Sequence, residues 1–271
     1  MSSPLFDLSD RVAVVSGAAR GMGRAMAMAF AEAGAHIVLA DLDADGAATT
    51  ATEIADLGSR ALPVTCDVSN VEQVRNLFAQ LDDEFGRVDV LANVAGEGVL
   101  CAPEDLTMEQ VERCLNSLIV GRFCCCQEAG RRMLNTGKGS IINIGSLASI
   151  TALGRGHTAY SMAMGGVAQM TRELSTEWSG RGVRVNAILC AQVVNPGLEE
   201  RMNADPHLRQ TYLRGIPSAR LGTPDDIRGP ALFLASDASR WVTGALLPMD
   251  GGNLAMNSGG TYPGSPALPG F

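Results

Sequence analysis

A glycine-rich loop stands between the first apolar run of the chain and its first helical stretch, where it could hold a phosphate group. The loop, residues 16–23, follows the run Val12–Val15. Glycine lets the backbone turn tightly and approach a pyrophosphate, and the N-terminus of the next helix offers free N–H groups and a positive dipole end. The sequence therefore predicts a dinucleotide site formed by Ser16, Gly17, Arg20, Gly21, Met22 and Gly23.

Asp41 ends the second apolar run, His36–Ala40, and could set the choice of dinucleotide. A carboxylate in this position would accept hydrogen bonds from the hydroxyls of the adenosine ribose and would repel a 2′-phosphate. NAD is therefore favoured over NADP. Arg20 is the one feature that favours NADP, since it could reach such a phosphate. The alternative interpretation is that Asp41 merely caps the helix that follows it.

Short β-rich runs alternate with helical stretches along the chain. We expect seven strands, at Val12–Val15, His36–Ala40, Ala61–Cys66, Val88–Ala92, Ser140–Ile144, Val183–Leu189 and Ala245–Met249. We expect helices between them, at Gly23–Ala33, Gly46–Leu57, Val71–Phe85, Met108–Asn135, Tyr160–Arg181 and Pro224–Ala235. Continuous apolar strands separated by helices are typical of a parallel sheet covered on both faces. The pattern predicts an α/β, doubly wound fold over residues 1–252, and the Gly-, Pro- and Ser-rich composition of 253–271 predicts an irregular tail.

Charge and composition narrow the range of partners to a small molecule. The formal net charge of −8 argues against nucleic acid and against an acidic membrane surface. No basic segment precedes an apolar stretch at the N-terminus, and no apolar run is long enough for a membrane span. Cys124, Cys125 and Cys126 are consecutive, so on a helix they point in three directions and form no metal site. We therefore expect a cytoplasmic protein with reduced thiols and no metal.

Several further segments follow the glycine-rich loop in an order that belongs to one protein family. They are Asp67-Val68, Asn93-Val94-Ala95-Gly96, the run from Ile141 to Ser146, the run from Gly182 to Ala187, and Asp250-Gly251-Gly252. With these motifs the chain resembles the short-chain dehydrogenase/reductase family over nearly its whole length.

The resemblance implies a Rossmann fold with a seven-stranded parallel sheet, assembled as a homotetramer or homodimer. The family dimerises through the helices that correspond here to the segment Phe123–Ala129 and to the helix of Tyr160. It also implies further contacts to NAD, from Leu42, Asp67, Val68, Asn93, Ala95, Gly96, Tyr160, Val193 and Asn195.

The catalytic residues of the family are only partly present. Ser146 matches the serine that polarises the substrate oxygen, and Tyr160, fourteen residues later, matches the general acid and base. The family's lysine belongs four residues after the tyrosine, on the same helical face, and this position is Met164. Leu118 stands where the family's asparagine is expected, and Asn116 could replace it only with an irregularity in the helix.

Loss of the lysine should change the chemistry of Tyr160. Without a cation nearby, its phenol should titrate closer to an unperturbed tyrosine, which penalises alcohol oxidation at neutral pH more than ketone reduction. His157 and Glu97 are candidate substitutes, because both lie close in sequence to matched site residues and both can exchange protons. Arg155 could bind an anionic substrate. For each of these three, the alternative is a solvated loop side chain.

The sequence thus favours an NAD(H)-dependent oxidoreductase that interconverts a secondary alcohol and a ketone on a small polar, sugar-like substrate. Two alternatives stay open. The pocket could perform elimination or isomerisation with bound NAD, with Glu97 or His157 as the base. The chain could also bind NAD without catalysis, as an assembly partner or sensor.

Overall fold

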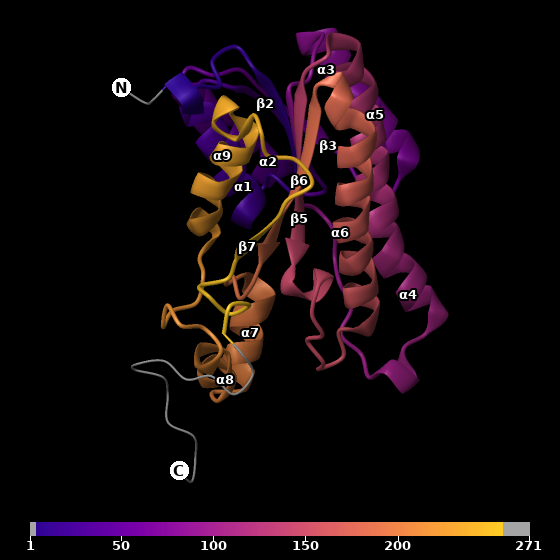
Figure 1. Ribbon diagram of the computed structural model, residues 1–271, viewed down its shortest axis with the longest axis vertical. Coiled ribbons are helices and arrows are strands. Elements are labelled where there is room, and N and C mark those ends of the chain that lie inside the picture. Colours follow the sequence, from indigo (N-terminus) through magenta and orange to yellow (C-terminus); the bar gives the residue numbers. More distant parts are fainter. Residues whose placement is uncertain (1–3, 257–271) are drawn as a thin grey trace.

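The computed structural model describes residues 4–256, in which one parallel sheet lies between two layers of helices (Figure 1). The strand order is β3-β2-β1-β4-β5-β6-β7, and every neighbouring pair is parallel. The strands are β1 (Val12–Ser16), β2 (His36–Asp41), β3 (Ala61–Thr65), β4 (Val90–Asn93), β5 (Gly139–Ser146), β6 (Val183–Cys190) and β7 (Leu246–Met249). The predicted doubly wound α/β fold is confirmed.

Alternation of side chains along β1 shows how the sheet joins its two helical layers. Ala13 and Val15 face one layer and Val12 and Val14 face the other, because successive strand residues point to opposite faces. The first layer holds α1 (Gly21–Glu32), α2 (Ala44–Asp56) and α9 (Arg228–Ala235). The second holds α3 (Val71–Phe85), α5 (Gly121–Thr136) and α6 (Thr158–Trp178) (Figure 1).

The long helix expected over Met108–Asn135 is interrupted in the structure. It consists of α4 (Met108–Leu115), a π-helical turn over Asn116–Val120, and α5. Gly121 ends the turn at a place where a Cβ would lie 2.2 Å from the carbonyl oxygen of Val68. The glycine therefore lets the helix approach the loop after β3, and the wider turn accommodates this approach.

Two short helices, α7 (Pro196–Ala204) and α8 (Leu208–Arg214), were not expected from the sequence. The Asn195 side chain caps α7 by accepting a hydrogen bond from the Leu198 N–H at 3.0 Å, and Pro196 occupies the first helical position. These helices carry too short an apolar pattern to be recognised, yet they extend the molecule beyond the carboxyl ends of the strands (Figure 1).

The sheet reverses its winding between β1 and β4, and the strand ends are tied together at this point. The buried Ser16 hydroxyl accepts hydrogen bonds from the N–H groups of Val94 and Ala95, at 3.0 and 3.2 Å. The crevice beyond the carboxyl ends of strands at such a reversal is the usual ligand site of an open α/β sheet.

Other expectations concern features away from this crevice. All seven cysteines are free thiols, as expected. Within residues 4–256, no helix combines the length and the apolar character that a membrane crossing requires. The proposed tail over 253–271 is described only as far as Met256, and residues 257–271 lie outside the described residues. The boundary at residue 252 stays a prediction.

A buried polar network connects the centre of the sheet to α6. Asn93 donates from Nδ2 to Asn143 Oδ1 at 2.9 Å, and Asn143 donates from Nδ2 to Thr171 Oγ1 at 3.0 Å. All three side chains are fully buried. Buried polar groups are costly to leave unpaired, so this network fixes how α6 packs on β4 and β5.

Replacement of Asn143 by alanine tests this network. Asn143→Ala should lower the free energy of unfolding by about 1–3 kcal/mol, because it removes the best acceptor of the Asn93 amide and the donor to the Thr171 hydroxyl in a fully buried place. Urea denaturation measures the loss. Asn135→Ala, at an exposed position of α5, is the matched control and should stay within about 0.5 kcal/mol of the parent. Equal stability of both variants would contradict the role of the network.

Candidate active site

Two cavities open side by side at the carboxyl edge of the sheet. The first, of about 550 Å³, is bordered by Gly17, Arg20 and Asp41, and we call it the glycine-loop cavity. The second, of about 540 Å³, is bordered by Ser146 and Tyr160, and we call it the Ser146–Tyr160 cavity. Both are lined by the segment Gly96–Gly98, so a single extended molecule can reach from one to the other.

The glycine-rich loop has the backbone shape that a phosphate cradle requires. Gly17 and Gly21 have φ angles of +71° and +58°, a conformation that other residues rarely adopt. A Cβ on Gly23 would lie 1.9 Å from the carbonyl oxygen of Gly17, so this position needs a glycine for the loop to close. No side chain caps the N-terminus of α1, and its first N–H groups remain available to an anion.

Asp41 lies at the end of β2, beside the glycine-rich loop. Its two carboxylate oxygens accept hydrogen bonds from the backbone N–H groups of Ala19 and Asp43, at 2.9 and 3.0 Å. These bonds hold the carboxylate at the wall of the glycine-loop cavity. The cap of α2 is Asp43, whose side chain accepts from Gly46, so the alternative that Asp41 merely caps this helix does not hold.

Ser146 and Tyr160 meet across the second cavity, although they come from different elements. Ser146 is the last residue of β5, and Tyr160 lies in the first turn of α6. Burial raises the pKa of the Tyr160 phenol above its ordinary value. A hydrogen bond with Ser146 and the positive charge of Arg122 act against this rise. The phenol therefore carries its proton at neutral pH.

The two candidate substitutes for the lysine have different surroundings. The ring of His157 lies 6.0 Å from that of Tyr160, and its Nδ1 bonds to the carbonyl oxygen of Gly154 at 2.7 Å. A carbonyl only accepts, so Nδ1 carries the proton and Nε2 is free to accept one. Burial lowers the pKa of His157. Glu97 is exposed at the mouth shared by the two cavities.

Met164 and Leu118 both line the Ser146–Tyr160 cavity, and both are buried. The helix irregularity that could have brought Asn116 into the cavity is present, as the π-helical turn. Asn116 nevertheless donates from Nδ2 to the carbonyl oxygen of Ser69 at 3.3 Å and is exposed. The turn thus directs Leu118, and not Asn116, towards the cavity.

The remaining predicted cofactor residues fall into two groups. Ser16 and Asn93 do not line either cavity, because their side chains bond to the strand ends and to the buried network described above. The glycine-loop cavity is lined by Leu42, Asp67, Val68, Ala95 and Gly96, and the Ser146–Tyr160 cavity by Met22, Gly96, Val193 and Asn195.

Two arginines that the sequence did not single out line the Ser146–Tyr160 cavity. Arg201 belongs to the unexpected helix α7. Arg122 is buried in α5. A signal was present, since Arg122 is a charged residue within the apolar run from Leu118 to Cys126. Among residues 4–256, no group of three or more His, Cys, Asp or Glu side chains could hold a metal ion.

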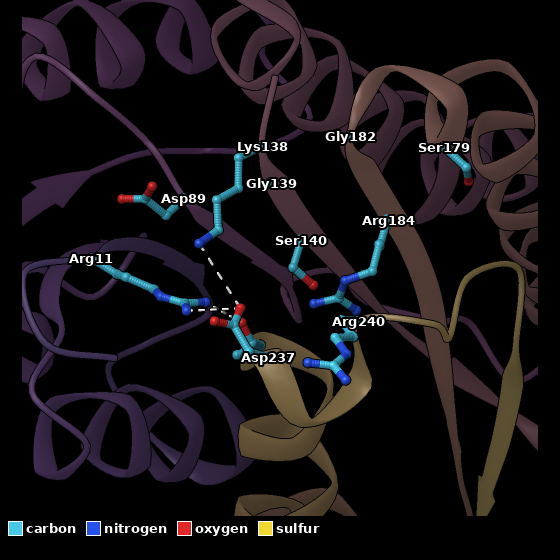
Figure 2. A pocket seen from close by; sticks show the side chains of 11 residues that line it. Arg11, Asp89, Lys138, Gly139, Ser140, Ser179, Gly182, Arg184, Asp237 and Arg240 are labelled. Carbon is cyan, nitrogen blue, oxygen red and sulfur yellow. Dashed lines mark hydrogen bonds and ion pairs between the residues drawn. The ribbon is translucent and has the colours of Figure 1, made fainter. Parts of the chain in front are cut away.

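A third cavity, of about 210 Å³, lies at the opposite edge of the sheet (Figure 2). Here Asp237 pairs with Arg11 at 2.9 Å and with Lys138 at 3.9 Å. Arg184 points into the same cavity and donates to the carbonyl oxygens of Leu234, Ser236 and Val242. The cations of this cavity pair with Asp237 or donate hydrogen bonds to backbone carbonyls of neighbouring segments. The glycine-rich loop lies at the other edge of the sheet.

Comparison with known proteins agrees with this geometry. Residues 17–253 match the family described as enoyl-(acyl carrier protein) reductase. D-threitol dehydrogenase of Mycolicibacterium smegmatis is 38% identical, over 91% of this chain and 94% of its own. The chain belongs to the short-chain dehydrogenase/reductase family. NAD-dependent glycerol dehydrogenase of Listeria innocua is 36% identical, over 91% of this chain and 95% of its own.

A solved structure of the family has the same fold. A gluconate 5-dehydrogenase from Burkholderia cenocepacia, in complex with NADP and tartrate, aligns with a TM-score of 0.88 and 30% identity, over 94% of this chain and 99% of its own. The protein is therefore an oxidoreductase of this family. The positive φ of Gly17, the close approach at Gly23 and the uncapped start of α1 fit the pyrophosphate of a nicotinamide dinucleotide.

A methyl group at Gly23 should disrupt the phosphate-binding loop. Gly23→Ala forces the loop apart, because the added Cβ meets the Gly17 carbonyl, and we expect NADH to bind about tenfold more weakly or worse. Fluorescence titration with NADH measures the affinity, and circular dichroism checks the fold. Gly229→Ala is the matched control, since a Cβ there meets nothing within 4 Å. Unchanged affinity of Gly23→Ala would refute this assignment of the loop.

Proposed function

We propose that the protein is an NAD(H)-dependent oxidoreductase that interconverts a secondary alcohol and a ketone on a small polyhydroxylated substrate. One observation carries this proposal. Ser146 and Tyr160 line a cavity that shares the segment Gly96–Gly98 with the glycine-loop cavity, so a substrate oxygen and a dinucleotide can be bound next to each other. The dinucleotide, when bound, supplies the hydride acceptor or donor.

Ser146 and Tyr160 would perform the proton transfer. The Ser146 hydroxyl would polarise the substrate oxygen, and Tyr160 would give its phenol proton to that oxygen in reduction or receive it in oxidation. Since burial raises the pKa of Tyr160, its acid form predominates at neutral pH. Ketone reduction is therefore the favoured direction near neutrality, and alcohol oxidation gains as the pH rises.

We assign NAD as the preferred dinucleotide on the position of Asp41. Its carboxylate is held at the wall of the glycine-loop cavity by the N–H groups of Ala19 and Asp43, where it would accept bonds from ribose hydroxyls and repel a 2′-phosphate. The glycerol dehydrogenase relative is named NAD-dependent, whereas the gluconate dehydrogenase structure contains NADP. Arg20, exposed beside the same cavity, is the residue that would tolerate NADP.

We assign a substrate that carries a carboxylate, on the charges of the outer cavity wall. Arg155 lies with its guanidinium 4.9 Å from the ring of Tyr212, and Arg201 donates to the carbonyl oxygen of Gly197 at 3.2 Å. Both arginines line the Ser146–Tyr160 cavity. Two cations at one end of a polar cavity suit the carboxylate of a sugar acid.

A homodimer or homotetramer would cover an apolar surface of α5 and α6. Phe123, Met162 and Val120 are exposed on or next to these helices, with 44%, 53% and 48% of their surface accessible. Large apolar side chains that are exposed in a single chain are typical of a subunit interface. They belong to or adjoin the helices through which the sequence resemblance also implied dimerisation.

Turnover with a panel of sugar acids, polyols and their keto forms tests the function. We expect NADH to be consumed with a keto acid at neutral pH, and NAD to be reduced by the alcohol mainly at alkaline pH. Tyr160→Phe should lower the rate by about a hundredfold or more in either direction, since general acid and base catalysis contributes this much. Full activity of Tyr160→Phe would refute the assigned role.

Asp41→Asn tests the choice of dinucleotide. The variant should raise kcat/KM for NADP relative to NAD by about fivefold, since removal of one like-charge contact is worth on the order of 1 kcal/mol. Asp45→Asn makes the same change of charge at an exposed position of α2 that does not line the cavity, and its preference should be that of the parent. An unchanged ratio in Asp41→Asn would show that Asp41 does not select the dinucleotide.

A further inference from the structure

Arg122 brings a positive charge to the base of the Ser146–Tyr160 cavity. The side chain starts in the first turn of α5 and is only 3% exposed. Nε donates to the carbonyl oxygen of Ala95 at 3.1 Å, and Nη2 donates to those of Val94 and Ala95 at 3.1 and 3.0 Å. Nη1 donates to the carbonyl oxygen of Ile144. The guanidinium thus joins the ends of β4 and β5.

The charge of Arg122 is not neutralised by a carboxylate. None of the ion pairs found within residues 4–256 includes it, and its hydrogen-bond partners are backbone carbonyls. Burial lowers the pKa of Arg122, but the ordinary value of an arginine is so high that the group stays protonated. A positive charge is therefore present in a buried position. Such a charge strongly favours any anion that forms next to it.

The acids around Arg122 differ in how readily they can become anions. They are Tyr160 and the thiols of Cys125, Cys126 and Cys190. Burial raises the pKa of Cys126 and of Cys190 to about 12, and that of Cys125 well above its ordinary value. These thiols stay neutral. Tyr160 also lines the cavity and exchanges its proton with the substrate, so it is the neighbour at which negative charge develops.

We propose that Arg122 is the positioning residue that stabilises the tyrosinate form of Tyr160 during proton transfer, in place of a cation at position 164. The inference rests on the proton-transfer role proposed for Tyr160. In ketone reduction the phenol proton moves to the substrate oxygen, and the tyrosinate is left facing Arg122. In alcohol oxidation the substrate hydroxyl returns the proton to the tyrosinate.

The local fold explains how a cation from α5 serves a tyrosine on α6. Met164 lies one turn after Tyr160 and is buried against Leu118, so this face of α6 supplies no charge. Gly121 lets α5 approach the loop after β3, and the π-helical turn before it places Leu118 towards the cavity. Arg122 follows directly and reaches the strand ends beneath the cavity.

Other groups also face Tyr160 and contribute to its titration. Ser146 of β5 donates a hydrogen bond that lowers the pKa of the phenol, and Cys190 of β6 and Cys114 of α4 raise it. The ring of His157, before α6, lies against that of Tyr160. Among the groups that act on the phenol, Arg122 is the cation, and its charge opposes the rise in the pKa of Tyr160 that burial causes.

Direct titration of Tyr160 tests the inference without a substrate. The ultraviolet absorbance of tyrosinate is followed with rising pH in the holoenzyme with bound NAD, and the signal of Tyr160→Phe is subtracted to isolate Tyr160. Arg122→Gln, which keeps hydrogen-bond donors but removes the charge, should shift the Tyr160 transition to higher pH. Arg122→Lys keeps the charge and should restore it towards the parent value. The pH at which the rate of alcohol oxidation rises should move in the same direction in each variant.

Two further variants separate charge from structure. Arg184→Gln removes a second arginine that donates to three carbonyls, at the far edge of the sheet (Figure 2), and it should leave the transition in place. In the register of β5 and β6, Arg184 lies six residues from Cys190, about 20 Å away. Met164→Lys in the Arg122→Gln background should bring the transition back down, because it returns a cation from α6.

The outcomes are distinct from those of the proposed function. A shift of the Tyr160 transition in Arg122→Gln that Arg122→Lys reverses supports the inference. If the parent then turned over no substrate, only the redox function would be refuted. An unmoved Tyr160 transition in Arg122→Gln, or an equal shift in Arg184→Gln, would overturn the inference while leaving the redox function standing. If Arg122→Gln does not fold, Met164→Lys in the parent background replaces it. Because Arg122 already supplies a cation, this variant should lower the transition by clearly less than the roughly three pH units expected of a lysine beside a phenol with no other cation, and a lowering of that full size would overturn the inference.

Discussion

The carboxyl edge of the sheet is organised around the guanidinium of Arg122. A charged group removed from water needs hydrogen bonds, and here the guanidinium makes four, to the carbonyl oxygens of Val94, Ala95 and Ile144. Ile144 lies near the end of β5, and Val94 and Ala95 directly follow β4, so satisfying the charge also fixes the two strand ends between which the cavities open. The same interaction that anchors the backbone leaves a positive charge beside Tyr160.

The rest of the site follows from that anchoring and from the parallel sheet. Ser16 ties β1 to the end of β4, so the glycine-rich loop and the segment Gly96–Gly98 keep a constant separation. A Cβ on Gly98 would lie 2.6 Å from the ring of Tyr160, so this segment also packs closely on the phenol. The dinucleotide and substrate regions are therefore adjacent because one short segment borders both of them.

Much of this arrangement could be predicted from the sequence. The strands, the glycine-rich loop and Asp41 were recognisable because glycine conformation and apolar periodicity are local properties of the chain. The π-helical turn was not, since it depends on the close contact of Gly121 with the carbonyl of Val68, far away in sequence. The helices α7 and α8 have too few residues to show a clear period.

The role of Arg122 illustrates a different limit. The loss of the lysine at position 164 was visible, but its compensation was not, because a side chain from another helix brings the charge. The sequence led us to expect a tyrosine without a nearby cation. The structure instead has a half-buried tyrosine that lines the same cavity as Arg122. Burial raises the pKa of its phenol, and the charge of Arg122 opposes this rise. Only the three-dimensional packing of α5, β4 and β5 places Arg122 and Tyr160 along the same cavity.

We propose that the joined cavities serve hydride transfer between a nicotinamide and a substrate carbon. The most direct measurement uses NADH with deuterium at its transferable position, incubated with the protein and a panel of keto sugar acids. We expect an alcohol product that carries one deuterium on the former carbonyl carbon, detected by mass spectrometry. A product formed without deuterium would contradict this proposal and would indicate elimination or isomerisation in the same pocket.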